Sequence, residues 1–352
     1  MDKAERTVIP KEEVVCCPIC SSMFNPVLHS RVPDSVFFVP GEWNISQCHS
    51  CQTLYLADRV VPQEISLIYL GYPEHQKKKQ RAQGTGINDL RRSSRWSRQG
   101  ILSAFKEGVL SGRLGYPIPP DKPLAYRMGK ALSEHSSIPF DSMTICVMHL
   151  PWKEGGRVLD VGCGGGDLLY RMKRHGWVVE GVDIDAKAVA LTRDLHIPAR
   201  VGTLIDQNYP VSFFDAISLK HVLEHEYKPL ELLRECHRIL TPGGMVSIVT
   251  PNANSRAHAR FGRHWRGLEP PRHVQIFSME SLRRIVSQAG FRIQKSWTSW
   301  RTAGYMWRHS AAIQSPRKIR LWPRSIGAGR FQLEEMLFGE GQGEELCLLA
   351  QK

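Results

Sequence analysis

Long apolar runs are absent from the chain: none approaches the roughly 18 residues that a membrane-spanning helix requires. The first residues, MDKAERTVIPKEEVV, lack the apolar stretch of a secretory signal. Internal repeats are also missing, and the composition of 42% hydrophobic and 23% charged residues is typical of a soluble globular protein. We therefore expect a cytoplasmic protein with reduced thiols. Its length of 352 residues suits about two or three domains.

Acidic residues are scarce in two stretches, so the net charge of +13 is unevenly spread. Residues 75–101 contain eight basic residues and one acid, and residues 292–330 contain nine basic residues and no acid. An anionic partner would suit them, whether a nucleotide-linked sugar, a phospholipid surface or nucleic acid, and a solvated basic surface would explain them equally well. Tryptophans interleave with the arginines of the second stretch, which suits either an anionic membrane surface or helices packed through core tryptophans.

Five of the nine cysteines lie within the first 51 residues. Cys17-Pro-Ile-Cys20 and Cys48-His-Ser-Cys51 form two C-x-x-C knuckles, and Cys16 leaves the register of the first open by one residue. Four thiolates from two such turns indicate a closed, structural zinc site, whereas a single C-x-x-C would also suit redox chemistry. We predict a zinc-binding β module over residues 1–72, with short strands at 35–39 and 53–56.

From residue 155 onward, strand-like and helix-like segments alternate, which is typical of a parallel sheet with helices on both faces. Strands are predicted at residues 157–161, 177–182, 214–219, 245–249, 291–297 and 346–350. Helices are predicted at residues 167–175, 186–194, 229–240 and 279–289, the third of them ended by Thr-Pro-Gly-Gly. Residues 73–150 are expected to form a basic, partly helical connector with a helix at about 96–112.

The first of these strands ends in a loop of alternating glycines led by an acid: Asp160-Val-Gly162-Cys163-Gly164-Gly-Gly166. Glycines allow the backbone to approach a ligand closely at the carboxyl edge of the strand. Asp183, at the end of the next strand, can accept hydrogen bonds from both hydroxyls of a ribose. An acid at the start of the loop disfavours a pyrophosphate and suits a ligand that carries an ammonium and a sulfonium group.

This loop resembles the motif of class I S-adenosylmethionine-dependent methyltransferases. Phe214–Leu219 is similar to the fourth strand of that family, Arg238–Gly244 to the turn before its fifth, and His273–Phe291 to its late segment. The resemblance covers about residues 120–300 and 343–352. It implies an α/β fold with a Rossmann-like, doubly wound, mostly parallel seven-stranded sheet. The cofactor domain would occupy residues 151–300, followed by a basic and aromatic helical insertion at 301–342 and the last strand at 343–352.

The resemblance also implies the roles of individual residues. Asp160 and the loop from Gly162 through Cys163 and Gly164 to Gly166 would hold the methionyl part of S-adenosylmethionine, and Asp183 would hold its ribose. The other candidate cofactor-binding residues flank these positions and the ends of the third and fourth strands: Ile184, Thr203, Leu204 and Lys220. Many members have an acid after the third strand that meets the adenine amine, whereas this chain has Gly202-Thr203-Leu204.

Methyl transfer requires a positioned acceptor and, for a hydroxyl or a carbon acid, the removal of its proton. The resemblance places the acceptor after the fourth strand, where the chain reads Lys-His221-Val-Leu-Glu224-His225. The spacing of His221 and His225 would put both on one face of a helical turn, with Glu224 beside His225 to support it as a base. The alternative is a packed helix start. His273, after Pro270-Pro271, is a second candidate base or part of a rigid connector.

The segment after the fourth strand lacks the Asn/Asp-Pro-Pro-Tyr/Phe signature of many amino-methylating relatives. An N-terminal zinc module resembles that of sugar- and glycan-modifying methyltransferases and, less closely, that of ribosomal-RNA guanine methyltransferases. We therefore predict methyl transfer to an oxygen or carbon of a small or carbohydrate-type acceptor, anionic and nucleotide- or lipid-linked, with peripheral contact to an anionic membrane as an added option. The alternatives are an RNA methyltransferase and a non-catalytic zinc protein that binds nucleic acid or protein.

Overall fold

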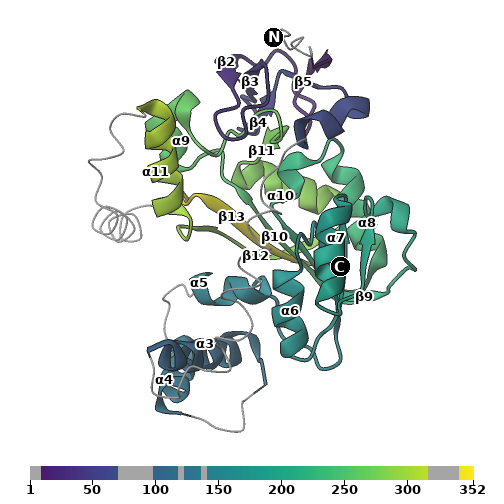
Figure 1. Ribbon diagram of the computed structural model, residues 1–352, viewed down its shortest axis with the longest axis vertical. Coiled ribbons are helices and arrows are strands. Elements are labelled where there is room, and N and C mark those ends of the chain that lie inside the picture. Colours follow the sequence, from purple (N-terminus) through teal and green to yellow (C-terminus); the bar gives the residue numbers. More distant parts are fainter. Residues whose placement is uncertain (1–8, 70–97, 118–122, 136–140, 316–340) are drawn as a thin grey trace, which may run out of the picture. The chain divides into compact units, whose positions relative to one another are not determined.

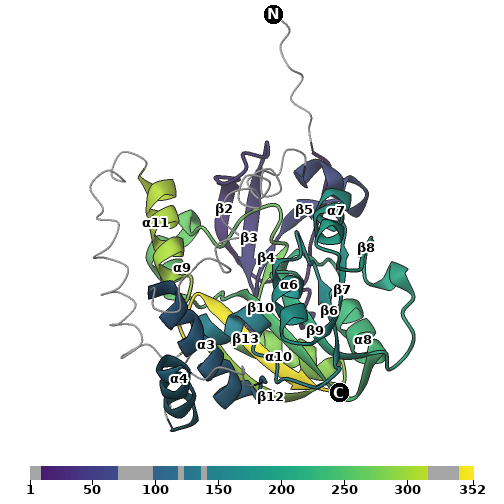
Figure 2. The same ribbon diagram turned by 60° about the horizontal axis from the view of Figure 1, so that its bottom comes forward.

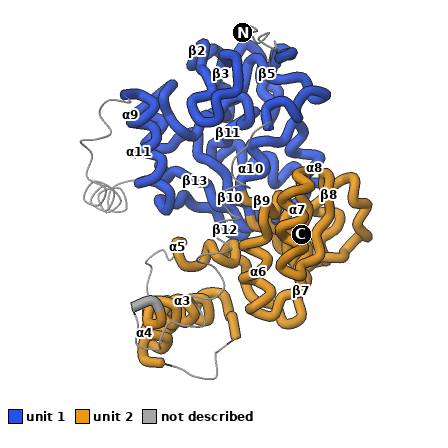
Figure 3. Tube along the Cα trace, viewed as in Figure 1, with its two compact units in different colours: residues 1–72, 221–234, 248–350 blue, residues 73–220, 235–247, 351–352 orange. Residues whose placement is uncertain are grey.

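The computed structural model describes residues 9–69, 98–117, 123–135, 141–315 and 341–352 (Figure 1). The chain divides into two compact units, which are coloured separately in Figure 3. Unit 1 combines residues 1–72 with 221–234 and 248–350, and unit 2 combines residues 73–220 with 235–247 and 351–352. None of the helices within the described ranges is long and apolar enough to cross a membrane.

Seven strands form the main sheet in the order β12-β13-β10-β9-β6-β7-β8. Their bounds are β6 Arg157–Val161, β7 Val178–Asp183, β8 Ala199–Val201, β9 Phe214–Lys220, β10 Leu240–Pro251, β12 Arg292–Ser299 and β13 Glu345–Gln351. The pairs β6–β7, β6–β9 and β7–β8 are parallel. Strands β6 and β9 are apolar and almost continuously buried, as expected when helices cover both faces of a sheet. The predicted α/β fold class is confirmed.

The predicted helices are present with ends shifted by one or two residues. They are α3 Arg98–Leu114, α6 Asp167–Arg174, α7 Ala186–Asp194, α8 Pro229–Ile239 and α10 Met279–Gln288. Local capping explains two of their starts: the Asp185 side chain accepts a hydrogen bond from Lys187 N, and Ser278 and Ser281 form a capping box. The Thr-Pro-Gly-Gly segment does not lie in a turn between elements as expected, because β10 already begins at Leu240.

Four further α-helices lie within the described residues: α4 Leu124–His135, α5 Asp141–Thr144, α9 Arg256–Phe261 and α11 Ala303–Gln314. Helices α3 and α4 pack against each other as a helical pair (Figure 2). Of the two basic stretches, residues 75–97 and 316–330 lie outside the described residues. Trp307, in the described part of the second stretch, packs its ring against Phe261 at a centroid distance of 5.1 Å, which favours a core role for this tryptophan.

The N-terminal residues form a second, antiparallel sheet in the order β11-β4-β3-β2. Its strands are β2 Val27–Pro33, β3 Glu42–Gln47, β4 Leu54–Leu56 and β11 Gln275–Ile276. The short strands β1 Lys11–Glu13 and β5 Asp58–Val60 pair separately. Gln275 lies opposite Tyr55 and Ile276 opposite Leu54, so a strand from late in the chain completes this sheet.

One hydrophobic core joins the N-terminal sheet to α9 and the loop after it, all within unit 1. Trp43 and Leu54 of the sheet and Ala257 of α9 are fully buried, and Trp265 is almost fully buried. Burial of apolar surface on this scale is the main force that holds such elements together. The cysteine-rich segment therefore shares its core with residues from the second half of the chain.

The strand predicted at residues 35–39 is wrong: these residues form a turn organised by the buried carboxylate of Asp34. Its oxygens accept hydrogen bonds from the backbone N–H groups of Val36, Phe37 and Val39. The same carboxylate pairs with the Arg272 guanidinium at 3.1 Å, and neither side chain has any exposed surface. The run of β-favouring residues at 35–39 suggested a strand, but a side chain that binds three N–H groups stabilises a turn instead.

Replacing Asp34 with asparagine is expected to destabilise the protein by about 3 kcal/mol, because it removes one of the two carboxylates, Asp34 and Glu269, that partner the buried Arg272 guanidinium. Urea unfolding followed by tryptophan fluorescence would measure the loss, since Trp43 and Trp265 lie in the neighbouring core. The matched control is Glu42→Gln, which breaks the solvent-exposed ion pair with Arg31 and should leave the midpoint unchanged. Equal midpoints for Asp34→Asn and the unaltered protein would contradict the prediction.

Candidate functional site

The four predicted zinc ligands lie together in unit 1. The Sγ atoms of Cys17 and Cys51 are 3.6 Å apart, those of Cys20 and Cys48 are 3.4 Å apart, and all four lie within 4.8 Å of one another. A tetrahedral zinc ion with Zn–S bonds of about 2.3 Å requires S–S distances of about 3.8 Å, which these positions nearly satisfy. Cys16 is not a member of the cluster, so the register is that of Cys17.

The glycine loop after β6 is held in a tight turn in unit 2. Gly162 N and Cys163 N both donate to Val182 O, and Gly166 N donates to Cys163 O. Gly166 has φ +78°, and a Cβ atom there would lie 2.9 Å from Thr192 Oγ1, so both backbone and space require glycine. The Cys163 thiol contacts Thr192 Oγ1, and the Cys163 N–H is bonded to Val182 O, so both groups interact with other parts of the protein. Cys163 thus contributes to the shape of the loop.

Asp183 at the end of β7 ties this loop to the neighbouring strand. Its Oδ2 accepts a hydrogen bond from Gly164 N at 2.8 Å, and its Oδ1 accepts one from Asp185 N at 2.9 Å. Each carboxylate oxygen has a second lone pair, so these bonds leave capacity for the hydroxyls of a ribose. The predicted contact of Asp183 with the cofactor stays a prediction, and its contact with the loop is a structural finding.

Asp160 is 3% exposed and lies on β6 opposite Ser218 of β9, whose Oγ donates to Asp160 Oδ1 at 2.5 Å. Burial raises the pKa of Asp160 to about 7, although Ser218 and the charge of Lys220 act in the opposite direction. An acid in this state is poised to become a carboxylate when a cation binds. Sequence reasoning missed Ser218; the signal was one hydroxyl in the apolar run of β9.

Three further candidate cofactor-binding residues, Ile184, Thr203 and Leu204, lie in the same unit and differ in their surroundings. Ile184 is 60% exposed, so its side chain offers an apolar face, whereas Leu204 is 2% exposed and packs inward. Thr203 donates from its N–H and its hydroxyl to Asp206 Oδ2. The acid that the sequence lacks directly after β8 is therefore present three residues after Thr203, and Asp206 is a functional candidate that the motif comparison missed.

His221 follows β9 directly and lies between two carboxylates. Its Nδ1 is 3.0 Å from Glu224 Oε1, and its Nε2 is 3.1 Å from Glu345 Oε1. Burial alone would lower the pKa of His221, but the hydrogen bonds to the two carboxylates outweigh it and raise the pKa. Both ring nitrogens therefore carry protons near neutral pH, and the ring has no lone pair with which to act as a base.

The expected geometry of this segment needs two corrections. His221 has φ +54° and precedes the 3-10 turn at Leu223–His225, so His221 and His225 do not share one helical face. Glu224 forms its hydrogen bonds with His221 and with Thr250 Oγ1, and not with His225. Burial would raise the pKa of Glu224, but His221 reverses this effect and lowers it to about 2, so the carboxylate is ionised.

The rings of His225 and His273 contact each other edge to face, with their centroids 4.9 Å apart. His225 Nδ1 lies 3.0 Å from Arg272 O, and His273 Nδ1 lies 2.8 Å from Gly267 O. Because a carbonyl oxygen only accepts, Nδ1 of each ring carries the proton, and in the neutral ring Nε2 carries the lone pair. Burial lowers the pKa of His273 to about 4, so this ring is neutral at pH 7.

Backbone contacts fix the two segments that carry these histidines. Val274 N donates to Glu224 O at 2.9 Å. The amide of Gln275 donates to Leu223 O and to Glu226 O, both at 2.7 Å. Ligand atoms of Glu224, His225 and His273 consequently lie within 4.8 Å of one another. Gln275 gave no signal in the sequence, because an interior glutamine in a short strand carries no motif.

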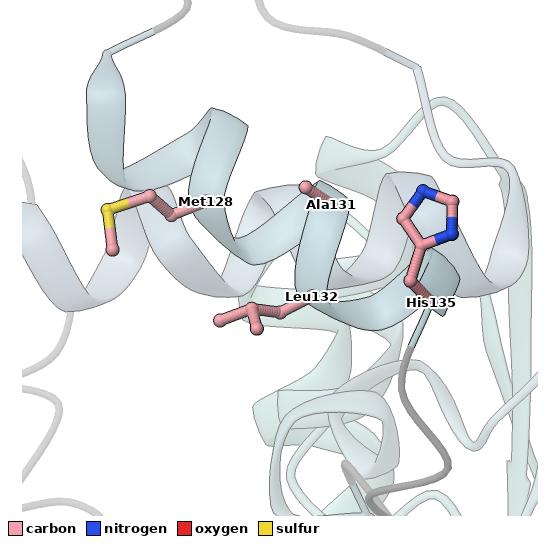
Figure 4. A pocket seen from close by; sticks show the side chains of 4 residues that line it. All are labelled: Met128, Ala131, Leu132 and His135. Atoms are coloured by element: carbon pink, nitrogen blue, oxygen red, sulfur yellow. The ribbon is translucent and has the colours of Figure 1, made fainter.

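An open apolar pocket lies on α4 in unit 2, away from these residues in the sequence. Met128, Ala131, Leu132 and His135 line it (Figure 4). None of the residues predicted to bind a cofactor, metal or acceptor contributes to it. We assign it no part in the candidate site.

Comparison with known proteins agrees with the geometry of the loop. Residues 147–296 match the family model described as methyltransferase domain. The ubiquinone biosynthesis O-methyltransferase of Pseudomonas aeruginosa is 34% identical over 113 residues, which are 30% of this chain and 48% of that protein. The protein of the same name from Alkalilimnicola ehrlichii is 34% identical over 138 residues, 37% of this chain and 54% of that protein. The chain thus spans about half the length of the curated relatives it matches.

Solved structures include a similar S-adenosylmethionine-dependent methyltransferase from Archaeoglobus fulgidus, with a TM-score of 0.40 and 21% identity. That alignment covers 56% of this chain and 86% of the other. The matched residues include the glycine loop, Asp183 and the three histidines His221, His225 and His273. Residues 147–296 of this chain therefore match a methyltransferase domain.

Proposed function

We propose that the protein transfers the methyl group of S-adenosylmethionine to a hydroxyl oxygen of a small acceptor. The observation that carries the proposal is the buried Asp160 beneath a preformed glycine loop, since a cationic ligand compensates a buried carboxylate. The ammonium group of the cofactor would pair with Asp160, its ribose with Asp183, and its adenine would lie against Ile184. These contacts involve only groups that unit 2 already holds in position.

An oxygen acceptor is favoured over carbon by two considerations. The curated relatives are O-methyltransferases by name. A hydroxyl must lose its proton during methyl transfer. Glu224 and His225, four and five residues after β9, supply proton-accepting atoms, and so does His273, which lies beside them. A carbohydrate-type acceptor remains our preferred class of molecule, because the cysteine cluster resembles the module found in such enzymes.

The cysteine cluster is proposed to hold a structural zinc ion. The four thiol groups are the His, Cys, Asp and Glu ligands that the described part of the chain gathers here, and four thiolates match a closed tetrahedral site that supports folding and not catalysis. Ser278 Oγ donates to Cys51 O at 2.6 Å, and β4 pairs with β11. Through these contacts the zinc would support the segment that carries His273.

Incubation with methyl-labelled S-adenosylmethionine and a cellular metabolite extract tests the proposed activity. We expect S-adenosylhomocysteine to form together with one labelled small molecule, whose methyl group is identified as O-methyl by carbon NMR. His225→Gln should bind S-adenosylhomocysteine normally and lose roughly a hundredfold or more in turnover. The control is His309→Gln, because His309 is an exposed histidine on α11.

Three outcomes would overturn the proposal. A labelled C-methyl product would exclude the oxygen acceptor, and label found in added RNA instead of metabolites would favour the RNA alternative. Cofactor binding without any S-adenosylhomocysteine from either extract would favour a non-catalytic protein on this fold.

A further inference from the structure

The cluster of Glu224, His225 and His273 has the composition of a metal site. Two imidazoles and one carboxylate present ligand atoms within 4.8 Å of one another in unit 1. Glu224 and His273 are buried, and His225 is half-buried. A ligand set of two histidines and one carboxylate leaves coordination positions open for a further molecule, unlike the four thiols of the cysteine cluster.

The hydrogen bonds around both histidines are those of metal ligands. Histidines that bind a metal almost always donate their other ring N–H to a carbonyl or a carboxylate, which fixes the tautomer and the ring orientation. His225 donates to Arg272 O and His273 to Gly267 O, so both rings meet this condition with Nδ1. Within the described part of the chain, Nε2 of neither ring forms a hydrogen bond. His273 Nε2 lies 4.0 Å from Glu269, beyond hydrogen-bond distance.

The third ligand is equally well oriented. Glu224 is fully buried, and its two oxygens accept hydrogen bonds from His221 and from Thr250. Since each carboxylate oxygen has two lone pairs, both can keep these bonds and still coordinate an ion. His221 would then act as a positioning residue that orients Glu224. The His221 ring is held in turn by Glu345, which also pairs with Arg301.

Hydrogen bonds and an ion pair hold the segments that carry the three ligands. The side-chain amide of Gln275 and the backbone N–H of Val274 bind carbonyl oxygens of the segment around Glu224 and His225, and Arg272 is anchored by Asp34. Preorganised ligands bind a metal more tightly because less conformational freedom is lost. One ligand atom of each ring lies within 4.8 Å of the other ring's ligand atom and of the buried Glu224 carboxylate.

We propose that Glu224, His225 and His273 bind a divalent transition-metal ion that is distinct from the zinc of the cysteine cluster. Two imidazole nitrogens favour ions such as Zn²⁺, Fe²⁺ or Co²⁺ over Mg²⁺ and Ca²⁺, which prefer oxygen ligands. A metal with open positions can coordinate a hydroxyl and lower its pKa. Binding of the ion does not depend on the methyl transfer proposed above.

Cobalt(II) is the probe for this site. Full-length protein that carries zinc in the cysteine cluster is dialysed against Co²⁺, and the metals bound per chain are counted. We expect one equivalent of cobalt in addition to one of zinc, with visible absorption that lacks thiolate-to-cobalt charge transfer. Excess Mg²⁺ should not displace the cobalt.

Two ligand variants and one matched control make the assignment specific. His225→Gln and His273→Gln should each weaken cobalt binding by roughly a hundredfold, since the loss of a ligand exceeds the effect of losing a supporting contact. His309→Gln should not, although His309 Nδ1 also bonds to a carbonyl, that of Tyr305, because His309 belongs to no group of three potential ligands among the described residues. Thermal unfolding would verify that each variant is folded.

The proposal fails if the folded protein binds no cobalt beyond the cysteine cluster, or if both ligand variants bind it as tightly as the unaltered chain. Neither measurement contains S-adenosylmethionine or an acceptor. A negative result would thus refute the metal site and leave the proposed methyl transfer to be judged by its own assay.

Discussion

Asp160→Asn is expected to weaken the binding of S-adenosylmethionine and S-adenosylhomocysteine by roughly a hundredfold or more, because a buried charge pair with the ligand ammonium is lost. Isothermal titration calorimetry measures the effect directly. The asparagine amide has the same shape and can still bond to Ser218, so the fold of β6 should survive. Asp194→Asn is the matched control, since Asp194 is exposed at the end of α7.

The same carboxyl group predicts how cofactor binding depends on pH. In the free protein the pKa of Asp160 lies near 7, raised by burial and by Asp183 and lowered by Ser218 and Lys220. Below this pKa the group must release a proton before it can pair with a cation, so the affinity should fall by up to about tenfold per pH unit. The affinity should level off above it. Asp160→Asn should abolish this dependence, and a flat profile for the unaltered protein would refute the assignment.

Cys48→Ser is expected to remove the zinc from the cysteine cluster and to abolish methyl transfer. A structural zinc ion contributes about 10 kcal/mol or more to the folding of small modules, which the N-terminal sheet could not replace. Metal analysis would report the lost zinc. Hydrogen exchange should increase in β4 and in its partner β11, an edge strand of that sheet that begins two residues after His273.

Cys16→Ser is the control for this change. Cys16 lies next to the first knuckle in the sequence but is not a member of the cluster, so zinc content and exchange should stay unchanged. If Cys48→Ser retained its zinc, the four-thiol assignment would be wrong. If it lost the zinc and kept full activity, the cluster would have no part in supporting the histidine segment.

Local sequence signals predicted the parts of the site that lie close together along the chain. The glycine loop and Asp183 belong to two successive strands, and each cysteine knuckle is a single turn, so spacing alone identified them. Ser218 required knowledge of which residue of β9 lies opposite Asp160, a register that spacing does not give. Asp206 escaped notice because it reaches Thr203 by folding back within its loop.

Long-range partners could not be predicted from one sequence. His221 pairs with Glu345, 124 positions later, and Asp34 pairs with Arg272, 238 positions later. The first pair keeps His221, a candidate base, protonated. In the second pair, Asp34 also stabilises a turn where a strand was predicted. In both cases a tertiary charge outweighs the local pattern, because a buried ion requires a partner wherever in the chain that partner lies.

The pairing of β11 with β4 has a consequence for biosynthesis. The N-terminal sheet has only three of its four strands until the ribosome has released residues 275–276. Contacts between such distant residues form slowly, since a long loop must close first. The cysteines are therefore translated long before their surroundings are complete, and a transplant of the N-terminal segment into a related enzyme would need β11 as well.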